Sequence, residues 1–175
     1  MINYCIALFP SKDVQDFANS YRKRYDPEYT LIQPHLLIMK DTVREISELD
    51  PIIRHLEQVA KEMAPFEVHF DRFSTLYPAK NVIILGVSDP EPLDECARKI
   101  LKGISVHSQQ TAPFTPFLTI GQGMSNDELQ DVLSSFRKIP VQLFTRIDRI
   151  HLLYQTANRA WTAHQTFLLQ GRQNE

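Results

Sequence analysis

The alternation of hydrophobic and polar residues divides the chain into short blocks that predict strands and amphipathic helices. An apolar run over residues 2–9 ends at Pro10, as expected of a buried strand. After Asp50 and again after Ser125, apolar residues recur at helical spacing and so share one stripe of a helix. Residues 66–71 alternate between apolar and polar side chains, as in a half-exposed strand. The pattern therefore indicates an α+β protein.

The same order of predicted elements occurs twice along the chain. Two β-α-β-α-β units are predicted, at about residues 2–78 and 81–155, with a closing strand at 160–169. Because one such unit leaves a sheet face uncovered, we expect the copies to pack against each other as a single bilobal domain over residues 1–175. Its two pseudo-symmetric lobes would carry largely antiparallel sheets that face a central cleft. Three pairs of matching segments support the repeat: 3–9 with 81–87, 34–38 with 116–120, and 70–77 with 147–154.

Charge and cysteine content narrow the possible partners. A net charge of −2 and a pI near 6.3 argue against a broad nucleic-acid-coating surface and against an anionic-membrane binder. Cys5 and Cys96 fit buried free thiols of a reducing compartment better than a disulfide. No apolar run approaches the length of a membrane span. We expect a cytoplasmic monomer without a membrane partner.

The first and last predicted helices have recognisable start signals. Ser11 and Ser125 are candidate N-caps. The first helix ends in a basic cluster of Arg22, Lys23 and Arg24, whose charges match the C-terminal end of the helix dipole. The alternative interpretation of this cluster is a contact for an anionic ligand near the cleft.

Two short phrases, Pro34-His35-Leu36-Leu37-Ile38 and Pro116-Phe117-Leu118-Thr119-Ile120, occupy equivalent places in the two repeats. Residues two apart in a strand point to the same side, so each phrase presents a pair of side chains together. A strand-borne His-x-Thr or His-x-Ser pair that recurs about 80 residues later resembles the motif of the two-histidine phosphoesterase superfamily. That superfamily includes the 2'-5' RNA ligase-like proteins and cyclic phosphodiesterases, and the resemblance covers nearly the whole chain.

The resemblance implies a specific chemistry, and the sequence departs from it at two positions. Opening a 2',3'-cyclic phosphate needs a base that activates water and an acid that protonates the leaving oxygen, and two imidazoles across a cleft do both. Here Leu37 stands where the first hydroxyl belongs, and Phe117 stands where the second imidazole belongs. His35 and Thr119 remain as the candidate catalytic residues, while Leu37 and Phe117 are candidate binding residues. A phenyl ring transfers no proton, so we expect catalysis to be lost or altered.

Other residues carry weaker signals. Tyr77 and Tyr154 end matching strands, where they could stack on bases or simply pack. His69 and His151 could supply the missing imidazole, although a surface or core-edge role is commoner for such histidines. Gly121-Gln122-Gly123 precedes a helix and could present amides to a phosphate, but the third glycine of a dinucleotide motif is absent. No spacing of histidines indicates a metal site, and no cofactor is expected.

Three functions remain open at this point. The first is a phosphoesterase that acts on a nucleotide or RNA-end phosphodiester through His35, Thr119 and a second acid-base group not yet identified. The second is a non-catalytic module that binds the same class of ligand in the cleft. The third is a structural or protein-interaction role, in which Leu37 and Phe117 fill the former cleft and leave no accessible pocket.

Overall fold

The computed structural model describes residues 1–104 and 116–172, so the loop expected at 104–115, with His107, lies almost wholly outside the described residues. Within these ranges the chain alternates between strands and helices as the sequence predicts. Its elements follow in chain order: β1 (Ile2–Leu8), α1 (Lys12–Tyr25), β2 (Leu36–Arg44), the 3-10 helix η1 (Ile46–Glu48), α2 (Leu49–Glu62), β3 (Phe66–Thr75), β4 (Ile83–Val87), α3 (Glu91–Lys102), β5 (Leu118–Gly121), α4 (Asn126–Phe136), β6 (Leu143–Ile147), β7 (Arg149–Gln155) and β8 (Trp161–Leu168).

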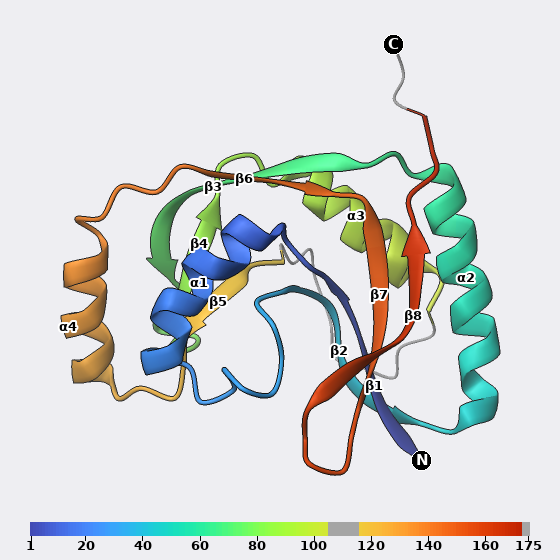
Figure 1. Ribbon diagram of the computed structural model, residues 1–175, viewed down its shortest axis with the longest axis horizontal. Coiled ribbons are helices and arrows are strands. Elements are labelled where there is room, and N and C mark those ends of the chain that lie inside the picture. Colours follow the sequence, from blue (N-terminus) through green and yellow to red (C-terminus); the bar gives the residue numbers. More distant parts are fainter. Residues whose placement is uncertain (105–115, 173–175) are drawn as a thin grey trace.

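The strands described form one curled antiparallel sheet in the order β6-β3-β4-β5-β2-β1-β7-β8 (Figure 1). Each half of this order has the same plan, because β2-β1-β7 on one side corresponds to β5-β4-β3 on the other. The third strand of each half comes from the other half of the chain, since β7 pairs with β1 and β3 pairs with β4. The two halves of the sheet therefore each include a strand from the other half of the chain, and they meet at the β2-β5 pair.

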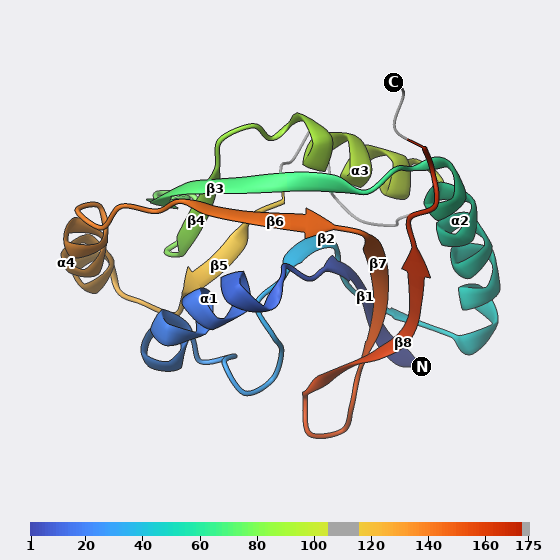
Figure 2. The ribbon, with the colours of Figure 1, turned by 45° about the horizontal axis from the view of Figure 1, so that its top comes forward.

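The helices lie against this sheet at both ends. In Figure 1, α2 stands beside β8 at one end and α4 stands at the other, and Figure 2 shows β3 and β6 running side by side. Ser125 caps α4 as predicted, since its hydroxyl accepts a hydrogen bond from the Glu128 N–H at 3.2 Å. Ser11 occupies the N-cap of α1, but its hydroxyl donates to the Asp13 carboxylate instead.

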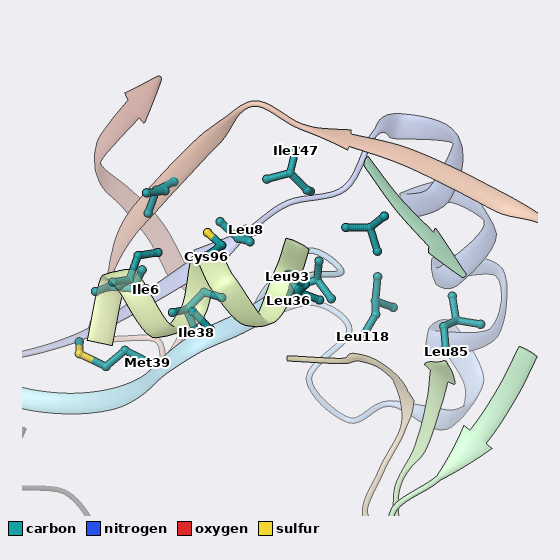
Figure 3. Packing of buried hydrophobic residues seen from close by; sticks show 14 of the residues in the cluster. Ile6, Leu8, Leu36, Ile38, Met39, Leu85, Leu93, Cys96, Leu118 and Ile147 are labelled. Atoms are coloured by element: carbon teal, nitrogen blue, oxygen red, sulfur yellow. The ribbon is translucent and has the colours of Figure 1, made fainter. Parts of the chain in front are cut away.

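One face of the sheet forms the main hydrophobic core. Leu36 and Ile38 of β2 are fully buried, and Leu93 and Cys96 of α3 pack beside them (Figure 3). Leu37, between them, points the other way, as the period of a strand requires, whereas a register shift between β1 and β2 places Met39 in the main core beside Ile38. Burying such aliphatic side chains stabilises the fold by about 1.5 to 3 kcal/mol each, so the register of β2 is strongly specified.

The opposite face of β1, β2 and β7 carries a second, smaller apolar cluster. Cys5, Ala7, Ile32 and Leu153 are its buried members. Three partly buried side chains pack against it: Phe9, Leu37 and Trp161. The candidate site lies directly on this cluster.

Two further expectations concern thiols and membranes. Both cysteines are buried free thiols, which confirms the prediction from their positions. No helix in the described ranges combines the length and the hydropathy that crossing a membrane requires.

Strand β2 continues to Arg44, and η1 follows it, in a polar stretch that periodicity alone leaves unassigned.

Candidate functional site

The two motif phrases lie side by side in the centre of the sheet. Strand β2 pairs with β5 in antiparallel fashion, and Leu36 is opposite Leu118. Continued by one residue to either side, this register would set Leu37 opposite Phe117 and His35 opposite Thr119. Directly opposite residues in an antiparallel pair have Cβ atoms about 4.5 to 5.5 Å apart. All four motif side chains thus emerge on the same face, away from the main core.

A cavity of about 450 Å³ opens on this face, here called the motif cavity. His35, Leu37, Phe117 and Thr119 all contribute to its wall. Leu37 and Phe117 therefore do not fill it, contrary to what the structural hypothesis requires. Its size suits a small ligand. Besides the four motif residues it is lined by Arg22, Asp26, Glu28, Ile32, Lys40, Leu76, Lys80, Val82 and Gln122.

His35 is held in a defined state. Its Nδ1 lies 2.8 Å from the Gln33 carbonyl oxygen. A carbonyl only accepts, so in the neutral ring the proton sits on Nδ1 and the Nε2 lone pair is left as an acceptor. Burial lowers the pKa of the His35 imidazole below its ordinary value of 6.5, the Gln33 hydrogen bond opposes this, and the nearby Arg22 charge lowers it further. His35 is thus neutral at pH 7 and suited to act as a base.

A buried ion pair between Arg22 and Asp26 also lines the motif cavity. Arg22 and Asp26 have side chains that are only 2% exposed, and Arg22 Nε donates to Asp26 Oδ2 at 3.0 Å. The guanidinium also donates to the Asn19 side-chain oxygen and to the Ile32 carbonyl, each at 2.8 Å. Asp26 Oδ1 accepts from Gln122 Nε2 at 2.8 Å. The network fixes the buried Arg22 in the cavity wall, where its charge lies close to the ligand space.

The close contact of α1 with β5 brings this pair to the cavity. The last turn of α1 packs on β5, where the Gln122 N–H donates to the Tyr25 carbonyl at 3.1 Å. Gly121 permits the approach, because a Cβ there would lie 3.0 Å from Met124 Cε and 3.1 Å from Tyr25 Cβ. A larger residue at 121 would push the end of α1, and with it Arg22, away from the motif strands.

Arg22 and Asp26 were not predicted as site residues. The sequence treats Arg22 as part of a basic helix end, exposed or near an anionic ligand. A usable signal was present, however, because Val14, Ala18 and Arg22 follow each other at intervals of four and so share the buried stripe of α1. Asp26, four residues after Arg22, completes that signal, since a buried arginine needs a counter-charge.

Two lysines add positive charge to the same cavity. Lys40 and Lys80 are exposed residues of its wall. Glu28, also exposed, brings one negative charge, while Asp26 is already paired with Arg22. The wall therefore has a positive excess, which favours an anionic ligand.

The tyrosines predicted to stack on bases lie elsewhere. Tyr77 is 43% exposed in the turn after β3, and its neighbour Leu76 lines the motif cavity instead. Tyr154 packs on the main core, on the opposite face of β7 from Leu153. The two-residue period of a strand explains this placement, because adjacent side chains alternate between faces. The stacking role expected of this pair has no support from the geometry.

Neither histidine that could replace the missing imidazole lines the motif cavity. His151 is opposite Ala7, with its ring against Phe9 at a centroid distance of 4.7 Å. Burial, with help from Arg149, lowers the pKa of His151 to about 4. His69 stacks on Phe144 at 4.2 Å in the other half of the sheet. Among the described residues, His35 is therefore the sole imidazole in the wall of the motif cavity.

Comparison with known proteins places this geometry in a family. The family model described as the 2'-5' RNA ligase superfamily matches residues 10–159. The chain belongs to this superfamily. A protein of Geobacillus sp. (strain WCH70), provisionally named a phosphoesterase, is 40% identical over 174 residues, which cover 99% of this chain and 100% of the relative. A Bacillus licheniformis protein with the same provisional description is 40% identical over 168 residues, which cover 96% of this chain and 99% of the relative.

Several solved structures have the same fold. E. coli LigT in complex with 3'-AMP matches with a TM-score of 0.70 at 13% identity, over 96% of this chain and 98% of that one. A crystal structure described as a phosphoesterase matches with a TM-score of 0.72 at 13% identity, over 97% of this chain and 99% of the other. The α+β fold with a curled antiparallel sheet, expected from the two-histidine phosphoesterase resemblance, is confirmed.

Proposed function

We propose that the motif cavity binds a nucleotide or RNA-end phosphodiester, with catalysis that is lost or strongly weakened relative to a two-histidine enzyme. The observation that carries the proposal is that His35, Leu37, Phe117 and Thr119 all line one cavity, beside the Leu36–Leu118 pair that joins β2 to β5. One imidazole and one hydroxyl remain on the wall, beside the buried Arg22. These groups suffice to hold a phosphate: the guanidinium and the hydroxyl donate to its oxygens.

The surviving groups supply only half of the proton transfers. For a 2',3'-cyclic phosphate, neutral His35 accepts a proton from water as the water oxygen attacks phosphorus. One of the two P–O bonds of the ring then breaks, and the ribose oxygen that leaves needs a proton. In a two-histidine site the opposite imidazolium donates it, but Phe117 has no proton to give. A positioned acid contributes about 10²- to 10⁴-fold to such a step, so its loss lowers the rate by that order.

Structural relatives support the class of ligand. E. coli LigT has been crystallised with 3'-AMP, with ATP, with NADP⁺ and with phosphate. These ligands share a phosphate group, and most carry a nucleoside. The positive excess of the motif cavity in this chain suits the same chemistry.

The test compares wild type, His35→Ala, Thr119→Ala and the repaired double variant Leu37→Thr plus Phe117→His. Each protein is titrated with uridine 2',3'-cyclic phosphate by calorimetry and then assayed for its hydrolysis. We expect wild type to bind with little or no turnover, and Thr119→Ala to bind more weakly. The repaired variant should hydrolyse the ester about 10²-fold faster or more.

A matched control introduces an imidazole elsewhere. Phe144→His places one on β6, at an exposed position away from the motif cavity, and should add no activity. Fast wild-type turnover that His35→Ala abolishes and the repair does not increase would show that another acid is present. If no cyclic or linear phosphate ester binds to wild type, the proposal is wrong.

A further inference from the structure

A second cavity lies next to the motif cavity and is here called the hairpin cavity. It has a volume of about 300 Å³ and is bounded on one side by the β7-β8 hairpin. The two cavities share a wall, made of Glu28, Ile32, His35 and Leu37. The two cavities are therefore neighbours, with these four residues between them. The residues of the hairpin cavity outside this shared wall are Cys5, Gln155, Arg159 and Trp161.

Trp161 gives the hairpin cavity an aromatic wall on a firm support. Part of its side chain packs on the small apolar cluster with Cys5 and Leu153. Its backbone N–H donates to the Leu31 carbonyl at 2.8 Å, which ties the start of β8 to the loop before His35. The side chain stays partly exposed. A rigid indole beside a cavity is a stacking platform that accepts any base.

Arg159 places a cation at the same cavity. It occupies the hairpin turn with a φ of 72°, and the Thr156 N–H donates to the Ala160 carbonyl at 2.8 Å to close that turn. Gln155 Nε2 donates to the Arg159 carbonyl at 3.0 Å and fixes the backbone further. The guanidinium itself is exposed, and such a group pairs with phosphate oxygens in a bidentate manner.

We propose that the hairpin cavity is a second nucleotide subsite, so that the ligand is an RNA end at least two nucleotides long and not a mononucleotide. The terminal phosphate lies in the motif cavity at His35 and Thr119. The base of the preceding nucleotide stacks on Trp161, and Arg159 pairs with a phosphate of the chain. Glu28, on the shared wall, accepts hydrogen bonds from ribose hydroxyls between the two cavities. This inference rests on the proposed function.

The chain itself carries the probe for this test, because Trp161 is its sole tryptophan. We would titrate wild type with 3'-UMP and with the dinucleotide ApUp, which also ends in a 3'-phosphate, and follow tryptophan emission and calorimetric heat. Neither ligand holds a cyclic ester, so that chemistry does not interfere. The dinucleotide should bind at least about tenfold more tightly and quench the emission to saturation, while 3'-UMP should bind with little change in emission.

Substitutions separate the two cavities. Trp161→Leu keeps an apolar contact with the small cluster but removes the stacking surface, and should weaken the dinucleotide about 5- to 150-fold while leaving 3'-UMP unaffected. Trp161→Phe retains a smaller ring, so its affinity for the dinucleotide should lie between those of wild type and Trp161→Leu. This graded order would show that the loss in the leucine variant is not a fold defect. Arg159→Asn tolerates the left-handed backbone and should also weaken the dinucleotide selectively. Arg98→Gln on the exposed face of α3 removes the same charge as a control and should change neither affinity.

The results distinguish failure of this inference from failure of the proposed function. If ApUp and 3'-UMP bind equally, or Trp161→Leu weakens both alike, the second subsite is wrong while the motif cavity stands. If neither ligand binds to wild type, the proposed function fails, and this inference fails with it.

Discussion

Arg22 and Asp26 are one helical turn apart and form an ion pair with an Nε to Oδ2 distance of 3.0 Å, both side chains being 2% exposed. Two charges so far from water are tolerated only when each has a complete set of partners. Here those partners include the Ile32 carbonyl and the Gln122 amide, from two segments that border the motif cavity. The pair therefore joins α1, the loop before β2 and the end of β5 at the candidate site.

Breaking the pair should destabilise the protein strongly. Arg22→Met leaves the Asp26 carboxylate buried without its counter-charge, which we expect to lower the free energy of unfolding by about 3 to 5 kcal/mol. Urea denaturation followed by circular dichroism measures this. The double variant Arg22→Met plus Asp26→Leu should recover much of the loss, because no lone charge remains.

The matched control for this prediction is the exposed pair Lys12–Asp16, which has the same spacing on the same helix but side chains 88% and 65% exposed. Lys12→Met should leave the urea midpoint unchanged. Equal effects of Arg22→Met and Lys12→Met would contradict the role assigned to burial.

Ligand affinity should depend on the protonation of His35. Its pKa lies below the ordinary value because of burial, so the ring is neutral at pH 7. A bound phosphodiester favours the imidazolium, and affinity should rise as the pH falls toward the pKa of the free protein. Calorimetric titration with uridine 2',3'-cyclic phosphate at several pH values tests this, since the ester keeps one negative charge throughout. His35→Gln should flatten the profile, and an unchanged slope in that variant would place the titrating group elsewhere.

His151 should make the fold sensitive to acid. Its pKa is about 4 in the folded protein against an ordinary 6.5, so the unfolded chain binds more protons between these values. Its contribution is fully present above the unfolded pKa and is lost as the pH falls. Because the ring keeps some contact with solvent, which screens the effect, we expect it to remove on the order of 1 to 2 kcal/mol between pH 7 and pH 4. In His151→Gln, the free energy of unfolding should fall by that much less between pH 7 and pH 4. If the free energy of unfolding of the two proteins had the same pH dependence, the assignment to His151 would be refuted.

The Cys96 thiol should be inert in the folded protein. Burial among the core residues of α3 raises its pKa to about 12, and only the thiolate is a strong nucleophile. In a Cys5→Ala background, a colourless disulfide reagent that releases a chromophore should not react at pH 8 until urea unfolds the chain. Rapid reaction of the native protein would show that α3 opens readily.

Much of the fold was open to prediction because it is encoded by local periodicity. The alternation in β3, the stripe of α2 and the cap at Ser125 each depend on neighbours within a few residues, and the structure has each of them. The family was also predictable, since His35 and Thr119 survive at the right spacing in two matching phrases. The duplication behind these phrases, and the roles of the four motif residues, stay predictions.

The rest depended on contacts between distant parts of the chain. Sequence periodicity shows which way a side chain points but not which strand lies next to it, so the exchange of β3 and β7 could not be read from the repeats. The same limit hid the site role of Arg22, whose burial requires Ile32 and Gln122 to close around it. It also left open whether Tyr154 stacks on a base or packs, because the sequence does not say which face of β7 meets the cavity.

The sequence by itself therefore determined most of the elements and the membership of the superfamily, since these rest on short-range spacing. The tertiary structure alone decided that Leu36 pairs with Leu118, that the four motif residues line one cavity, and that an ion pair lies beside it. The physical reason is that register and burial arise from packing between segments far apart in the chain. The energy of such packing depends on both segments and cannot be read from either one alone.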